Sequence, residues 1–72
     1  MPSKYPVLQS SEVIQRLEHF GFSFVSQKGS HRKYKKGSRV VIVPMHDEIA
    51  KGTLKSILQQ AGLSLDEFLQ QN

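Results

Sequence analysis

The fold is decided by the stretch FSFVSQKGSHRKYKKGSRVVIVP, residues 22–44. Aromatic and β-branched residues, which favour strands, are interrupted here by two Gly-Ser pairs that begin at Gly29 and Gly37. Pro44 ends the last apolar run because it cannot donate a hydrogen bond to a neighbouring strand. With turns at 29–30 and 36–38, the pattern predicts an antiparallel meander of three strands, at residues 22–26, 31–35 and 39–43.

Apolar residues on both sides of this stretch recur at the spacing of one helix face. Upstream, Ser10 or Ser11 is a suitable N-cap, and Gly21 supplies a C-terminal stop. Downstream, the same periodicity ends at Gly62. The expected helices are residues 11–20, residues 51–61 and a short C-terminal helix that begins at a capping box of Ser64 and Glu67.

These elements predict an α+β fold of the order α-β-β-β-α, formed by a single domain that spans residues 1–72. Two helices with one apolar stripe each bury most surface when both stack on the same face of the sheet. We therefore expect a three-stranded antiparallel sheet with two helices on one face, plus the short C-terminal helix. A chain of this length buries only about 60% of its unfolded surface, so we expect an open site and no deep cofactor cavity.

The composition argues against several classes of protein. The chain has no cysteine, which excludes disulfides and thiolate metal sites and suits a reducing cytoplasm. No run approaches the ~18 apolar residues of a membrane span, and the N-terminus lacks the apolar core of a secretory signal, so we expect a cytoplasmic protein without a membrane partner. A net charge of +4, with all charges between residues 28 and 39 positive, favours a polyanionic partner.

Strand alternation divides the side chains of the expected middle strand between two faces. His31, Lys33 and Lys35 share one face, and Arg32 and Tyr34 share the other. If Tyr34 faces the helices, His31 is exposed on the open face, provided that no bulge lies near the turn. Val41 and Val43, if they share this open face, would form an apolar patch that a partner protein or a second copy could cover.

An exposed imidazole beside several cations is suited to phosphodiester cleavage without a metal. Imidazoles change protonation near pH 6.5 and can move a proton, and fixed positive charge stabilises a phosphorane. The same pattern also fits a solvated surface histidine and a charged hairpin that keeps a sheet edge soluble. We expect no metal and no other cofactor, because the three histidines, His19, His31 and His46, lie on different elements without ligand spacing.

Three motifs occur in order: KGSH-x-x-Y at residues 28–34, VPMH at residues 43–46 and KGTLKSIL-x-x-AGL at residues 51–63. Together they resemble the motifs of the HicA mRNA interferases, and the resemblance extends from the first expected helix to the last. The resemblance implies a fold like the double-stranded-RNA-binding domain and endoribonuclease activity on mRNA. It also implies the role of toxin in a type II toxin–antitoxin pair, with a HicB-like antitoxin as the protein partner and single-stranded mRNA as the substrate.

In this family the histidine of the Gly-Ser-His motif is catalytic, and it corresponds to His31, which we expect to act as general acid or base. The residues expected to bind RNA are Lys28, Gly29, Ser30, Arg32, Lys33, Lys35 and Lys51. The alternative function is a non-catalytic module that binds double-stranded RNA by shape and phosphate contacts.

Several individual roles stay open at this point. Gly29 suits a turn with positive φ, and the Ser30 hydroxyl could bind a phosphate or the turn backbone. Tyr34 could stack on a base, although a position in the core fits it better. Gly52 and Thr53 fit a phosphate site at a helix N-terminus, or else a close helix-sheet contact and a cap residue. His46 fits a capping role after the last strand or an assisting role in catalysis.

Overall fold

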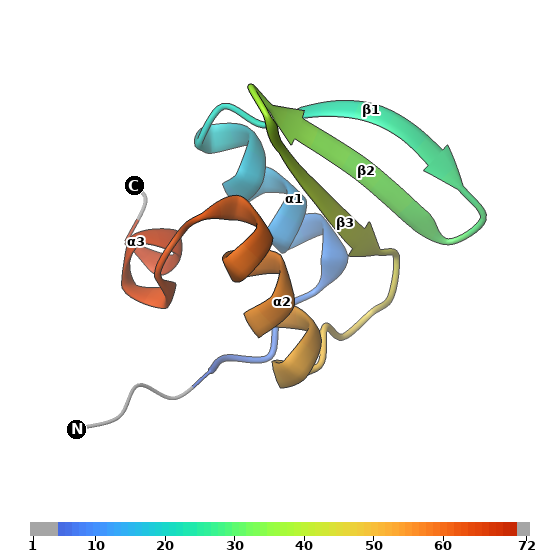
Figure 1. Cartoon of the computed structure of the whole chain (residues 1–72). Helices are drawn as coiled ribbons and strands as arrows, with labels where there is room; N and C mark the ends of the chain where they lie inside the picture. The colour runs from blue at the N-terminus through green and yellow to red at the C-terminus, as the bar shows by residue number, and fades with distance from the viewer. Residues whose placement is uncertain (1–4, 71–72) are drawn as a thin grey trace.

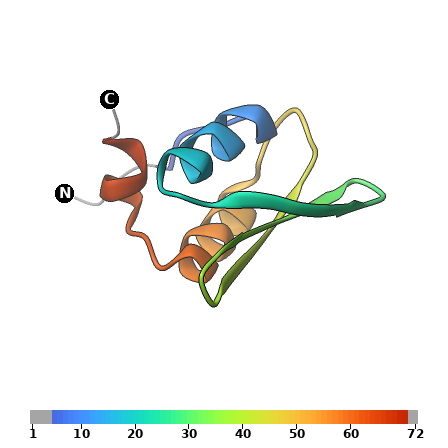
Figure 2. The same cartoon turned by 90° about the horizontal axis from the view of Figure 1, so that it is seen from above.

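The computed structural model describes residues 5–70 and confirms the expected order of helices and strands. The elements are α1 Ser10–His19, β1 Ser23–Lys28, β2 His31–Lys36, β3 Arg39–Pro44, α2 Lys51–Ala61 and α3 Leu65–Leu69. The strands pair antiparallel in the order β1-β2-β3. Figure 1 shows α1 and α2 on the same side of the sheet, and Figures 1 and 2 both show the β1–β2 hairpin extending beyond the helices. Among residues 5–70, no helix has the length and apolar character to cross a bilayer.

Two short turns set the register of the sheet. Lys28 is paired with His31 and Lys36 with Arg39, so each hairpin has a two-residue loop. A β-bulge interrupts β1 between Phe24 and Ser26. Because the bulge lies in β1, the pairing of β2 with β3 is regular along its whole length, and the alternation of side chains in β2 is preserved.

The condition for an apolar patch of Val41 and Val43 on the open face is not met. Residues directly paired in an antiparallel sheet share a face, and Val41 is paired with Tyr34. Val41 and Val43 are completely buried beneath the helices, and Tyr34 is 1% exposed, which confirms its expected place in the core. The open face instead carries Val40 and Ile42, which are 40% and 37% exposed.

The core lies between the sheet and the helices. Each helix contributes one apolar stripe, and the buried residues are Val13, Ile14 and Leu17 of α1, Leu54, Ile57, Leu58 and Ala61 of α2, and Leu65 and Phe68 of α3. Arg16 of α1 donates a hydrogen bond to the carbonyl oxygen of Phe68 at 3.2 Å, which ties α3 to α1. The expected capping box of Ser64 and Glu67 is present at the start of α3.

The N-terminus of α1 differs from the expectation, since neither serine is its N-cap. Gln9 is the N-cap, and its N–H donates to the Glu12 carboxylate at 2.9 Å. Ser10 is the first helical residue and is 4% exposed. Its hydroxyl lies 2.8 Å from the carbonyl oxygen of Pro44 and accepts a hydrogen bond from the His46 N–H at 2.6 Å. Ser10 therefore joins α1 to the loop that follows β3.

Helix α2 has the bounds that the sequence predicts, Lys51–Ala61, and it ends at Gly62 in the left-handed conformation with φ +73°. Of the two alternatives left open for Gly52 and Thr53, the structure does not support the structural one. The N-cap is Ala50 rather than Thr53, and a Cβ at Gly52 would meet no atom within 4 Å. Gly52 is therefore not required for close packing against the sheet.

Candidate functional site

His31 is the first residue of β2, and its side chain is exposed on the sheet face away from the helices. Two features of the sequence place it there. Tyr34 is drawn into the core by its large apolar ring, and the strand period of two then turns His31 outward. The conditional prediction that an inward Tyr34 leaves His31 on the open face is thus confirmed.

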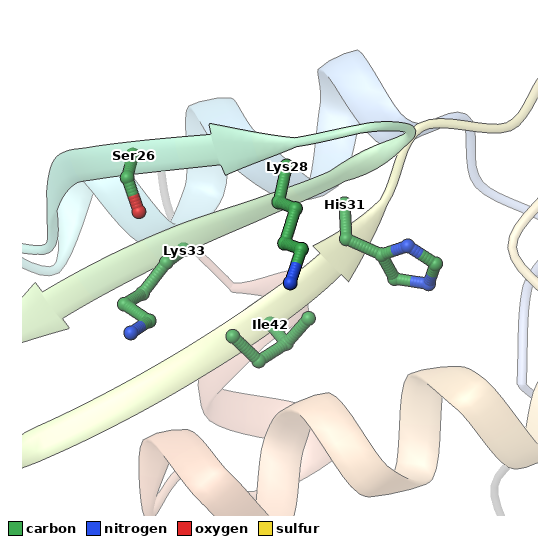
Figure 3. A pocket seen from close by; sticks show the side chains of 5 residues that line it. All are labelled: Ser26, Lys28, His31, Lys33 and Ile42. Carbon is green, nitrogen blue, oxygen red and sulfur yellow. The ribbon is translucent and has the colours of Figure 1, made fainter.

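The open face around His31 is hollowed into a groove with a volume of about 490 Å³. Its walls come from all three strands, and the lining residues are Ser26, Lys28, His31, Lys33 and Ile42. Figure 3 shows that these side chains all project from the same side of the sheet, with the Lys28 side chain lying between those of Lys33 and His31. The groove therefore combines one imidazole, two ammonium groups, a hydroxyl and an apolar floor.

The β1–β2 turn holds His31 in position beside Lys28. Gly29 has φ +58°, which is the value that a type II′ turn requires at its first loop residue and that other residues rarely adopt. The expectation of a positive φ at Gly29 is confirmed. The Ser30 carbonyl oxygen accepts a hydrogen bond from the Met45 N–H at 2.6 Å, so this turn is attached to the residue that follows β3.

The role of the Ser30 hydroxyl stays a prediction. Ser30 is exposed beside His31, and within residues 5–70 its hydroxyl makes no hydrogen bond to the turn backbone. Ser30 is not one of the residues that line the groove.

The structure separates the other predicted RNA-binding residues from one another. Lys35 lies on the same face as His31 but beyond the groove, paired with Ser23 and Val40. Arg32 lies on the opposite face, where its Nε donates to the Gln27 side-chain oxygen at 3.0 Å. Lys51 begins α2, and its ammonium nitrogen lies 5.4 Å from the centre of the Tyr5 ring.

The two remaining histidines do not line the groove of His31. The His46 side chain lines a separate cavity of about 220 Å³ near the N-terminus of α1. His19 ends α1 and stacks edge-on against Phe20 with ring centres 5.6 Å apart. In the part of the chain that the structure describes, no three His, Asp or Glu side chains gather as a metal-binding group.

Sequence reasoning missed Ser26 and Ile42 as residues of the groove. Both are paired with Lys33, Ser26 across β1 and Ile42 across β3. The strand register could have identified them. For example, a two-residue turn at Gly37 and Ser38 places Ile42 opposite Lys33, whereas a three-residue turn would not. Ile42 supplies an apolar surface between the cations, which suits the face of a nucleobase.

The groove combines chemical groups that are suited to a phosphodiester and to proton transfer. The ammonium groups of Lys28 and Lys33 line the same groove as the imidazole of His31, and no acidic residue occurs between Glu18 and Asp47 to neutralise them. Phosphate oxygens attract such cations, and a nearby imidazole can accept or donate a proton at the same linkage. The local arrangement thus supports nucleotide chemistry on an open surface.

Comparison with known proteins agrees with the motifs. A search of curated proteins found no match. The sequence model described as HicA toxin of bacterial toxin-antitoxin systems matches residues 10–63, which is more than half of the 72 residues. This range contains the sheet, α1, α2 and every residue that lines the groove. The chain therefore belongs to the HicA toxin family, the toxins of bacterial toxin–antitoxin pairs.

Proposed function

We propose that this toxin is a metal-independent endoribonuclease that cleaves mRNA, with His31 as general acid and base. The observation that carries the proposal is the exposed imidazole of His31 in one groove with Lys28 and Lys33. Family membership supports the role of toxin, and the groove supplies the chemical groups that RNA cleavage needs.

The proposed reaction uses the ribose 2′-OH as nucleophile. Neutral His31 accepts the 2′-OH proton while the 2′ oxygen forms a bond to phosphorus, and the bond from phosphorus to the 5′ oxygen breaks. The imidazolium then returns the proton to the departing 5′ oxygen, so the products are a 2′,3′-cyclic phosphate and a 5′-hydroxyl. Lys28 and Lys33 stabilise the charge that develops on the phosphorane oxygens. The proton transfers require only the imidazole of His31, and stabilisation of the negative charge on the phosphorane requires only the ammonium groups of Lys28 and Lys33.

Cleavage by the purified protein in EDTA tests this proposal. The unsubstituted protein should cut mRNA and leave cyclic phosphate ends, and His31→Ala should not. His19→Ala is the matched control, because it removes an exposed imidazole of α1 that does not line the groove. His31→Ala should still bind a 2′-O-methyl RNA strand, which cannot be cut by this route.

Each alternative outcome has a clear meaning. Cleavage by His31→Ala would reject the assignment of the general acid and base. Loss of cleavage by the unsubstituted protein in EDTA, with recovery on adding a divalent cation, would show a metal-dependent reaction. RNA binding without cleavage by the unsubstituted protein would favour the alternative of a binding module.

The family implies a cognate antitoxin, and we propose that this partner is a HicB-like protein. Its binding surface is not formed by Val41 and Val43, because both are buried. Formation of a stable complex when the two proteins are mixed, measured by size-exclusion chromatography, tests this partner.

A further inference from the structure

The reverse face of the β1–β2 hairpin carries an aromatic ring and a guanidinium that the proposed reaction does not use. Phe24 is paired with Tyr34, and Arg32 is paired with Gln27, so all four lie on the face opposite His31. Tyr34 is covered by the helices, but β1 is an outer strand and the Phe24 side chain is 52% exposed. Figure 2 shows this hairpin extending past the helices.

Hydrogen bonds hold the Arg32 side chain next to the Phe24 ring. The Gln27 side-chain amide donates to the Gly29 carbonyl oxygen at 3.0 Å and accepts from Arg32 Nε at 3.0 Å. The central guanidinium carbon then lies 5.8 Å from the centre of the Phe24 ring, which itself packs edge-on against Tyr34 at 5.8 Å. Because these contacts already restrict both side chains, a ligand that binds them loses little conformational entropy to their ordering.

The charge around this pair favours a polyanion as its ligand. The sequence between Glu18 and Asp47 contains no acidic residue, so no carboxylate of the hairpin neutralises Arg32. An accessible aromatic face beside a guanidinium is the surface on which single-stranded nucleic acids stack their bases. A protein partner would instead have to supply acidic groups to a ring surrounded by cations.

We infer that Phe24 and Arg32 form a stacking site for an unpaired nucleobase of the same RNA strand whose phosphate lies in the His31 groove. This inference rests on the proposed RNA substrate. The strand would pass around the outer edge of β1, where Lys28 faces the groove and Gln27 faces the stacking site on adjacent positions.

This path of the RNA around β1 favours a single strand over a duplex as the substrate. A sheet and its side chains are about 10 Å through from one face to the other, so a flexible single strand can turn around the edge. A duplex is too stiff to contact both faces of one hairpin, since its persistence length is near 150 base pairs for DNA. The stacking site therefore selects RNA that is unpaired next to the cleaved linkage.

Binding of a 2′-O-methyl oligoribonucleotide that carries 2-aminopurine tests the inference without any cleavage. Phe24→Leu keeps an apolar side chain over Tyr34 but removes the aromatic face, and it should weaken binding by about 5-fold to 150-fold. Arg32→Lys keeps the charge but removes the planar surface, and it should weaken binding in the same direction. Val25→Ala is the control, because Val25 is 49% exposed on the same strand and is not aromatic, and it should leave the affinity unchanged.

A fully paired duplex of the same sequence should bind Phe24→Leu and the unsubstituted protein equally. Unchanged affinity of Phe24→Leu and Arg32→Lys for the single strand would overturn the inference, as would equal losses for single strand and duplex. Loss of antitoxin binding alone would assign the pair to a protein interface instead. Circular dichroism checks folding, and Arg32→Lys carries the test if Phe24→Leu is unfolded. Because the probe is not cut, failure of His31 as the catalytic residue would leave this measurement unaffected.

Discussion

Charge reversals on the two faces of β2 test whether the groove supplies the phosphate contacts to RNA. Lys33 lines the groove, whereas Lys36 lies on the opposite face with its ammonium nitrogen 6.0 Å from the centre of the Phe22 ring. Lys33→Glu and Lys36→Glu each change the net charge from +4 to +2 and lie in the same strand. The pair of variants therefore differs in the face that loses its cation and not in total charge.

The salt dependence of binding gives the expected magnitude. Each single-strand phosphate that a cation neutralises contributes about 0.7 log units of affinity per log unit of salt. Lys33→Glu should reduce this slope by about 0.7, and Lys33→Glu with Lys35→Glu should reduce it by about 1.4. Between 50 mM and 200 mM salt, the loss of affinity should then be about 7-fold smaller for the double variant than for the unsubstituted protein.

Fluorescence anisotropy of a labelled 2′-O-methyl strand at four salt concentrations measures these slopes. Lys36→Glu should weaken binding slightly at low salt through its long-range charge and leave the slope close to that of the unsubstituted protein. An equal reduction of slope by Lys33→Glu and Lys36→Glu would refute the reasoning, because the RNA would then respond to total charge and not to the groove.

Two further predictions concern the stability of the fold, and urea unfolding measures both. Gly62→Ala should lower the free energy of unfolding by at least about 1–2 kcal/mol, because φ is +73° and the new Cβ would meet the Arg39 guanidinium. Adding Arg39→Ala should recover only the part due to that contact, and full recovery would show that φ costs nothing. Ser10→Ala should cost about 0.5–1.5 kcal/mol, because it removes the hydroxyl that bonds to the backbone of Pro44 and His46, although these two residues keep their hydrogen bond to each other, and a neutral effect would contradict this role.

The sequence was informative wherever local physics decides the structure. Strand β2 alternates cations with one tyrosine, so burial of Tyr34 alone determines the face of His31 and Lys33. Helix α2 has a regular apolar stripe and a glycine after it, and its bounds were predicted without error. These features depend on neighbours that are close in the chain.

The faces of β3 could not be predicted in the same way. Val40 to Val43 are four consecutive β-branched residues, so no polar position shows which side faces the core. Their orientation depends on the turn before them. A three-residue turn at 36–38 would pair Tyr34 with Val40, whereas the observed two-residue turn pairs it with Val41. The turn is one residue shorter than expected, and this difference exchanges the faces on which the side chains of β3 lie.

The N-terminus of α1 and the composition of the groove depend on contacts between distant segments. Ser10 is a good N-cap by type, but its hydroxyl donates to the carbonyl oxygen of Pro44, the last residue of β3, which is 34 residues away. Ser26 lines the groove only because the bulge shifts the register of β1 by one residue and so pairs Ser26 with Lys33. Local preferences do not report such contacts, which arise from packing and register.

The two faces of the sheet have different roles, which explains how a chain of this size can form both a core and a candidate site. On one face of β2 and β3, the side chains of Tyr34, Val41 and Val43 are buried in the core. On the other face, His31 and Lys33 line the open groove. Since His31 is exposed and contributes nothing to the core, its substitution should leave folding intact. The hairpin that carries His31 projects beyond the helices. Substitutions on the open face of β2 should therefore affect RNA cleavage, and substitutions on its buried face should affect folding.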